Sequence, residues 1–259
     1  MRSWKAEGLV NTRGFVFRKP IKLGNCTILL DDNRMCINVE VQASDKLELE
    51  HIEKLALLEA KKTCLILSMV TGRYFAFDNF VRVIETTPSA KEIPMKQRFG
   101  VRGRVAIPEL KASLHKEAVD ISKLMKKMDP YTLKAVDYFE KGMVLSKWNE
   151  DAFLNFFKAM ELFSKKYSKE ADPKEIHRIF GKPKKKLTTK EKMLFTCQKL
   201  RIPSRWTPTL NELVDKRNKQ DVAHAKLSTG DVNLTDVNNC QILSKLVIVN
   251  YLKKLAGTL

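Results

Sequence analysis

The sequence lacks a long apolar run, a signal peptide and a clustered set of cysteines. Its longest apolar stretch, Cys64–Val70, is far shorter than the about 18 residues that a membrane-spanning helix needs. Charged residues among the first seven positions interrupt any apolar core of a signal peptide. The five cysteines are an odd number, widely spaced and without a Cys-x-x-Cys pair, which predicts reduced and mostly buried thiols. They are Cys26, Cys36, Cys64, Cys197 and Cys240. We therefore expect a cytoplasmic protein that does not enter a membrane.

Residues that hold metals or nucleotide cofactors are also scarce. His51, His115 and His177 show no metal-ligand spacing with one another or with the cysteines. Gly181-Lys182 lacks the upstream glycine and strand of a phosphate-binding nucleotide loop. We expect neither a metal ion nor a cofactor.

Acidic residues are few compared with basic residues. The 259-residue chain has 48 Lys and Arg but 30 Asp and Glu, a formal net charge of +18. Hydrophobic residues make up 44% and charged residues 30%, which is typical of a globular protein. Such a positive excess favours polyanions such as nucleic acid or an anionic membrane surface, and of these nucleic acid is the expected partner.

The first hundred residues combine strand patterns with one long helix. Gly14–Arg18 and Cys26–Leu30 are short β-rich runs, and Cys36–Gln42 alternates apolar and polar residues after the turn sequence Asp31-Asp32-Asn33, which predicts a hairpin. Apolar residues then recur at steps of three and four from Leu49 to Gly72, which predicts an amphipathic helix. Two further strand-like runs follow, the first at 74–77 together with 80–84 and the second at 99–107.

Strand patterns stop near Pro108, or at the latest near Asp129-Pro130, and helical periodicity follows. Helices are expected at 110–128, from Pro130 with Asp129 as N-cap to about 145, at 150–168, 188–200, 210–225 and 236–255. The fold class is therefore α+β. Residues 1–108 form a domain for sensing or substrate binding, and residues 109–259 form an antiparallel helical bundle.

One helical segment carries groups suited to phosphodiester chemistry. Arg217 and His224 are seven residues apart, almost two turns of an α-helix, so their side chains share one face. Asp221 lies four residues after Arg217 and three before His224, and Asn218 stands beside the stripe. A guanidinium can grip a phosphate, and an imidazole can move a proton near neutral pH. The same spacing also fits a row of exposed ion pairs on the helix surface. Spacing alone therefore does not decide between a catalytic site and surface ion pairs.

The motif Arg217-Asn218 followed by Val222-Ala-His224-Ala resembles the signature of HEPN domains, in which a polar residue often follows the arginine and four to six residues separate it from the histidine. This chain has six. The segment Phe153–Ser164 resembles the earlier HEPN helix that presents an acidic residue, here Glu161, to that pair. The resemblance covers roughly residues 129–255.

The resemblance implies a metal-independent endoribonuclease that leaves 2',3'-cyclic phosphate ends, in phage defence, toxin action or RNA processing. It implies that His224 acts as general acid or base, that Arg217 holds the phosphate and that Asn218 adds a hydrogen bond. Glu161 and Asp221 would orient the pair. It also implies a homodimer through the bundle, with single-stranded RNA as the substrate.

Further basic residues are candidates for RNA contact. They are Lys182, Lys184, Lys185, Lys186, Arg102 and Arg104. A dense lysine run is also typical of a solvated loop. In the first half, Phe15, Phe17, Phe75 and Phe77 interleave with cations, which fits base stacking but fits a packed sheet at least as well.

Two alternative functions remain at this point. The bundle can be a non-catalytic HEPN module that binds RNA or a partner protein. Alternatively, the β-rich domain binds nucleic acid and the bundle only dimerises.

Overall fold

The computed structural model describes residues 2–12, 15–31, 34–44, 47–86, 105–107, 111–146, 148–223 and 232–259. The chain divides into two compact units, residues 1–123 and 124–259. The boundary predicted at Pro108 lies outside the described residues. The first unit contains a sheet and the second is helical, which confirms the α+β class.

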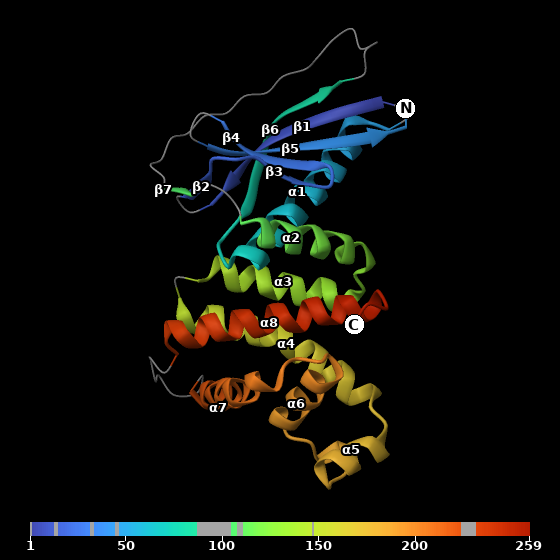
Figure 1. Ribbon diagram of the computed structural model, residues 1–259, viewed down its shortest axis with the longest axis vertical. Helices are drawn as coiled ribbons and strands as arrows, with labels where there is room; N and C mark the ends of the chain where they lie inside the picture. Colours follow the sequence, from blue (N-terminus) through green and yellow to red (C-terminus); the bar gives the residue numbers. More distant parts are fainter. Residues whose placement is uncertain are drawn as a thin grey trace. The chain divides into compact units, whose positions relative to one another are not determined.

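An antiparallel sheet of five strands in the order β3-β4-β5-β1-β6 forms the N-terminal unit (Figure 1). The strands are β1 (Arg2–Asn11), β3 (Ile21–Leu23), β4 (Cys26–Asp31), β5 (Arg34–Ala43) and β6 (Ala76–Glu85). A separate parallel pair joins β2 (Phe15–Phe17) to β7 (Val105–Ile107). Predicted residues 99–104 of the last strand lie outside the described ranges.

The predicted hairpin is confirmed, since β4 pairs with β5 from Asp31 opposite Arg34 to Cys26 opposite Val39. In β5 the alternate residues Ile37, Val39 and Val41 are buried, whereas Glu40 and Gln42 are exposed. The period-two pattern therefore correctly identified a strand with one face against the core.

Helix α1 (Leu49–Thr71) packs on this sheet, as predicted. Gly72 ends it in the left-handed region at φ 68°, which glycine adopts without the steric penalty of a Cβ atom. Its backbone N–H donates to Ser68 O. Helix α2 (Ala112–Leu124) and a 3-10 turn (Met125–Lys127) follow, within the predicted range of 110–128.

Two expectations for this unit agree with the structure. The expected run of 74–77 with 80–84 is confirmed as one strand, β6, which continues past Phe77 through a bulged register against β1. The aromatic rings of Phe17 and Phe75 are buried and stacked on each other, with centroids 5.9 Å apart. These two rings belong to the core and are not placed to stack on bases.

The helical unit consists of packed helices around α4. Its helices are α3 (Pro130–Val144), α4 (Asn149–Glu170), α5 (Pro173–Phe180), α6 (Thr189–Lys199), α7 (Thr207–Ala223) and α8 (Leu234–Leu255). Helix α4 contacts α3, α6 and α8, and its buried face carries Phe153, Phe156, Phe157 and Phe163. The rings on α4 therefore form the centre of the hydrophobic core.

The close packing of α3 against α4 requires a glycine at position 142. A Cβ atom on Gly142 of α3 would lie 2.6 Å from Cε1 of Phe156. That ring is buried and already packs against Phe139 at a centroid distance of 5.2 Å. Glycine is needed here for a close helix-to-helix approach.

We predict that Gly142→Ala lowers the free energy of unfolding by about 1–3 kcal/mol, because the added methyl overpacks the interface. The effect is opposite to the gain of about 1 kcal/mol that alanine usually brings to a helix. Urea unfolding followed by circular dichroism measures it. In a Phe156→Leu background the penalty of Gly142→Ala should shrink, and an undiminished penalty there would contradict this packing.

Asp129 links three helices. Its Oδ1 accepts the N–H of Thr132 at 2.8 Å and so caps α3, as predicted. Its Oδ2 accepts the hydroxyl of Tyr251 on α8 at 2.6 Å and lies 3.6 Å from Nζ of Lys166 on α4. Burial alone would raise the pKa of Asp129, but the hydrogen bonds from Tyr251 and Thr132 and the charge of Lys166 together lower it.

This lowered pKa predicts an acid-sensitive contribution to stability. The contribution is complete above the unfolded-state pKa, about 3.9 for aspartate, and is lost as pH falls through the lower pKa of the folded state. Wild type should therefore lose more unfolding free energy between neutral pH and pH near 3 than Asp129→Asn does. Urea unfolding measures the unfolding free energy of both proteins at each pH. If the two values fall equally over this range, Asp129 contributes nothing to the pH dependence of stability.

Residues 169–192 include the dense lysine run, for which a solvated loop was one interpretation, and they contain helix α5 and a 3-10 turn (Lys184–Lys186). Asp172 caps α5 by accepting the N–H of Lys174, Pro173 occupies its first turn, and Gly181 ends it at φ 66°. These are ordinary helix boundary signals, and the lysines around them obscured the pattern.

Candidate functional site

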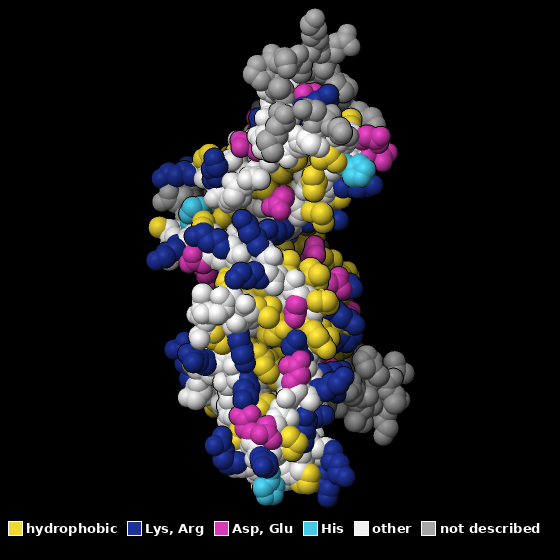
Figure 2. All heavy atoms as spheres, turned by 90° about the vertical axis from the view of Figure 1, so that its right-hand side faces the viewer, with side chains coloured by type: hydrophobic (Ala, Val, Ile, Leu, Met, Phe, Trp, Pro, Cys, Tyr) yellow, Lys and Arg dark blue, Asp and Glu magenta, His cyan; other side chains and the backbone are white. Residues whose placement is uncertain are grey.

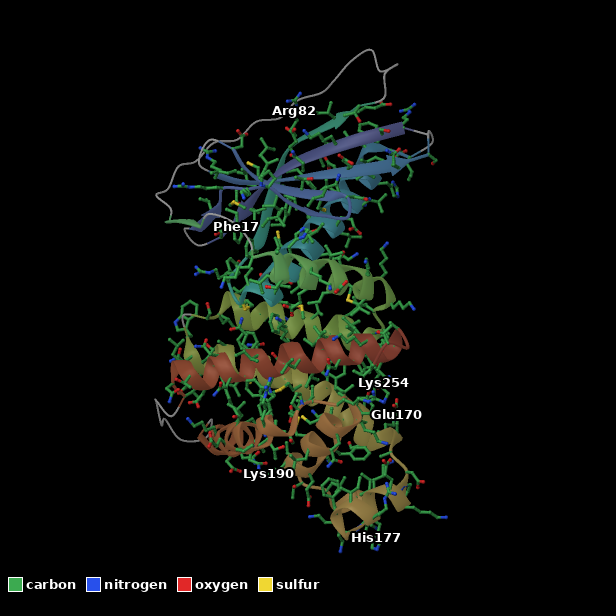
Figure 3. The ribbon with its side chains drawn as sticks, in the orientation of Figure 1. Phe17, Arg82, Glu170, His177, Lys190 and Lys254 are labelled. Carbon is green, nitrogen blue, oxygen red and sulfur yellow. The ribbon has the colours of Figure 1, made fainter. Side chains whose placement is uncertain are left out.

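Helix α7 is held by three consecutive side chains that each pair with a different helix. Asp215 lies 3.6 Å from Lys190, whose position on α6 is labelled in Figure 3. Lys216 pairs with α8, and Arg217 pairs with α4. The three pairs are Lys190–Asp215, Lys216–Asp236 and Arg217–Glu161. Leu213 and Val214, which directly precede Asp215 on α7, are buried. The helix that carries the predicted site is thus fixed in rotation within the bundle.

Arg217 lies against α4. Its Nη2 donates to Oε1 of Glu161 at 3.1 Å, and its guanidinium carbon lies 5.9 Å from the ring centre of Phe157. Phe157 and Glu161 are four residues apart, so they share one face of α4 and receive the guanidinium together. The exposed fractions of the two charged side chains are 22% for Arg217 and 13% for Glu161. At this partial burial, water screens the attraction between the two charges less than it does at the open surface.

Glu161 lies between two cations. Its second oxygen is 3.8 Å from Nζ of Lys165, one turn further along α4. The carboxylate therefore holds Arg217 from one side while a largely exposed lysine approaches from the other. A guanidinium is planar and has five N–H donors, a geometry that can engage a carboxylate and a phosphate together.

Among the predicted catalytic residues, the structure brings together Arg217 and Glu161, which are far apart in sequence. Asn218 is exposed next to Arg217. Helix α7 continues through Ala223, so position 221 follows Arg217 by one turn. The side chain of Asp221 and all of His224 lie outside what the structure describes.

The predicted RNA-binding cations are used in different ways. Lys182 forms an ion pair with Glu191 at 2.6 Å. Lys184 is turned inward, and its ammonium donates to the carbonyl oxygen of Ala171 at 2.7 Å and to that of Lys169. Lys185 and Lys186 are exposed, whereas Arg102 and Arg104 lie outside the described residues. Two of the four lysines thus have internal partners.

A cavity of about 480 Å³ opens beside this lysine turn. Its walls come from the end of α4, the start of α5, the 3-10 turn and α6. It is lined by Ser168, Lys169, Pro173, Pro183, Lys184, Lys185 and Lys192. Lys169 was not among the predicted residues. It and Lys192, a member of the dense lysine run, come from two separate helices, and only the fold places them next to Lys185.

Other reactive groups in the described residues are dispersed. His177 is exposed on α5, away from α7 (Figure 3), and His115 Nε2 lies 3.0 Å from the carbonyl oxygen of Lys22. Within the described ranges, no three His, Cys, Asp or Glu side chains come together as metal ligands. In that same part of the chain, no helix has the length and apolar character to cross a membrane.

All five cysteines lie in described ranges, and none forms a disulfide. Cys26, Cys64 and Cys240 are buried, as predicted. Burial raises the pKa of Cys26 to about 11 and that of Cys197 to about 12. These two thiols are therefore poor nucleophiles near neutral pH.

Comparisons with protein-family models, curated proteins and solved structures give no match for this chain.

Proposed function

We propose that this protein is a metal-independent endoribonuclease of the HEPN type, acting on single-stranded RNA. The observation that carries the proposal is the ion pair between Arg217 on α7 and Glu161 on α4. The resemblance required an acidic residue on the earlier helix to face the arginine of the motif. The local sequence around Arg217 and around Glu161 does not by itself require contact between the two side chains.

In the proposed reaction, the 2'-hydroxyl oxygen of a ribose attacks the adjacent phosphorus while a general base removes its proton. The bond from phosphorus to the 5' oxygen breaks, and that oxygen takes a proton. The products are a 2',3'-cyclic phosphate and a 5'-hydroxyl. His224 serves as acid or base, and Arg217 balances the charge that develops on the phosphate.

The remaining residues position this pair. Glu161 holds the guanidinium in one orientation, and Asn218 adds a hydrogen bond to the phosphate. Asp221, one turn after Arg217, orients His224 or Arg217. The net charge of +18 supplies a long-range attraction for RNA.

The proposal includes a homodimer in which the α7 helices of two copies face one cleft. Two such helices would place two arginines around one phosphate. The N-terminal unit, with its open sheet, then selects the substrate or senses a signal.

The test of this proposal uses an oligoribonucleotide whose cleavage position has first been mapped with the purified wild-type protein. A 2'-O-methyl group at that position removes the attacking hydroxyl, so cleavage there should stop. The same modification one nucleotide further along the strand is the control and should leave cleavage intact. Continued cutting at the methylated position would rule out the proposed chemistry.

A second candidate function is a non-catalytic module that binds RNA or a partner protein. The observation in its favour is that Glu161 already neutralises Arg217, an arrangement that also suits a purely structural ion pair. In that case RNA binds with strong salt dependence but is not cut. Binding without cleavage in the mapping experiment would favour this candidate.

A further inference from the structure

The cavity beside the lysine turn, which we call the lysine cavity, has an unusual charge composition. Four of its seven lining residues are lysines, and none is acidic. Pro173 and Pro183 add apolar surface to the wall. Its volume of about 480 Å³ lies within the range of small-molecule sites. Figure 2 shows Lys and Arg side chains along the lower end of the molecule, where α5 lies.

The acidic side chains nearest in sequence have other partners. Asp172 accepts the backbone N–H of Lys174 at 2.9 Å and caps α5. Glu191 pairs with Lys182 at 2.6 Å and accepts the N–H of Thr188 in a capping box. The other nearby pairs are Lys199–Glu175 at 2.6 Å and Lys166–Glu170 at 3.6 Å. In the part of the chain that the structure describes, Lys169, Lys185 and Lys192 have no acidic side chain within ion-pair distance. Among the described residues, three lysines therefore line the cavity without a carboxylate partner.

Lys184 has a different role from these three. Its bonds to the carbonyl oxygens of Lys169 and Ala171 fasten the 3-10 turn to the C-terminal end of α4. The turn is thereby fixed, and Lys185 is held at the rim of the cavity. The site is preorganised, so an anion does not have to order the turn on binding.

Phosphate groups fit this arrangement best. Lysine ammonium groups bind phosphates as point charges, and several of them around one space favour a ligand with more than one negative charge. The apolar proline surfaces suit the sugar or base of a nucleotide better than they suit a bare inorganic ion. The volume admits such a ligand.

We propose that the lysine cavity binds the phosphate groups of a nucleotide, with Lys169, Lys185 and Lys192 as the binding cations. The nucleotide is either free or part of an RNA strand. This site is separate from the Arg217 pair, and its existence does not depend on the proposed cleavage.

The experiment measures the binding of two probes, ATP and a short single-stranded oligoribonucleotide, to full-length protein at several salt concentrations. The variant is the triple substitution Lys169→Gln, Lys185→Gln, Lys192→Gln. The control is Lys126→Gln, Lys127→Gln, Lys134→Gln, which removes the same charge from exposed positions of the same unit away from the cavity lining. Circular dichroism melting verifies that both proteins are folded.

We expect the cavity variant to bind at least one probe about tenfold or more weakly, and the control to stay within about twofold of wild type. With the oligoribonucleotide, loss of three phosphate contacts should reduce the slope of log K against log salt by about 2. Binding of ATP that depends on the three lysines would identify a free nucleotide as the ligand. If only the binding of the oligoribonucleotide depends on the three lysines, the ligand is the backbone of an RNA strand.

Equal losses in the two triple variants would overturn the proposal, since they would show attraction by net charge alone. Failure of wild type to bind either probe would overturn it as well. The single reversal Lys185→Glu at an exposed position provides a second measurement and should weaken the same probe. Arg217→Ala should leave ATP binding unchanged, so failure of the cavity and failure of the cleavage proposal can be told apart.

Discussion

His224→Ala is expected to slow RNA cleavage by about 100-fold or more, the usual loss when a general acid or base is removed. The proposed reaction needs one proton taken from the 2'-hydroxyl and one given to the 5' oxygen, and no other histidine is proposed for this work. Single-turnover cleavage of labelled RNA by purified protein measures the effect. RNA binding should change little, because the loss lies in proton transfer.

His177→Ala is the matched control. It removes the same side chain from an exposed position on α5, outside the proposed site (Figure 3). Its cleavage rate should equal that of wild type. If His224→Ala also cleaves at the wild-type rate, His224 has no role in catalysis and the assignment fails.

Arg217→Ala is expected to lower the cleavage rate by about 100-fold or more, a typical loss when one charge-stabilising donor is removed from an active site. The substitution also leaves Glu161 partly buried without its hydrogen-bond partner, for which we expect about 1–3 kcal/mol of lost unfolding free energy. Both effects are measurable on one preparation, by single-turnover kinetics and by urea unfolding.

Arg205→Ala is the control for this substitution, because it removes an exposed arginine just before α7 and should change neither quantity. Glu161→Gln separates the two roles of the pair. It keeps the size of the side chain and one acceptor, so cleavage should fall less than in Arg217→Ala. If Arg217→Ala is less stable but cleaves RNA at the wild-type rate, the ion pair between Arg217 and Glu161 has a structural role and not a catalytic one.

Much of the fold was predictable because local signals agreed with the tertiary environment. The three- and four-residue periodicity from Leu49 and the glycine at position 72 gave the correct bounds of α1. Asp129-Pro130 marked the start of α3, and the observed cap is the one expected from these residue types. The motif resemblance also led to the pairing of Glu161 with Arg217, which periodicity alone could not provide.

Other elements were missed for identifiable reasons. Strand β1, which lies between β5 and β6, was not predicted because its buried positions include Ala6 and Gly8, whose small side chains give a weak alternating pattern. The lysine cavity was not predictable because Lys169, Lys185 and Lys192 come from three separate elements. Their proximity depends on the packing of α4 against α6 and on the turn fastened by Lys184.

The most direct test of the central claim is analysis of product ends after wild-type protein cuts single-stranded RNA in excess EDTA. The account predicts undiminished cleavage, with 2',3'-cyclic phosphate on one fragment and 5'-hydroxyl on the other. Cleavage that stops in EDTA, or fragments with 3'-hydroxyl and 5'-phosphate ends, would contradict it.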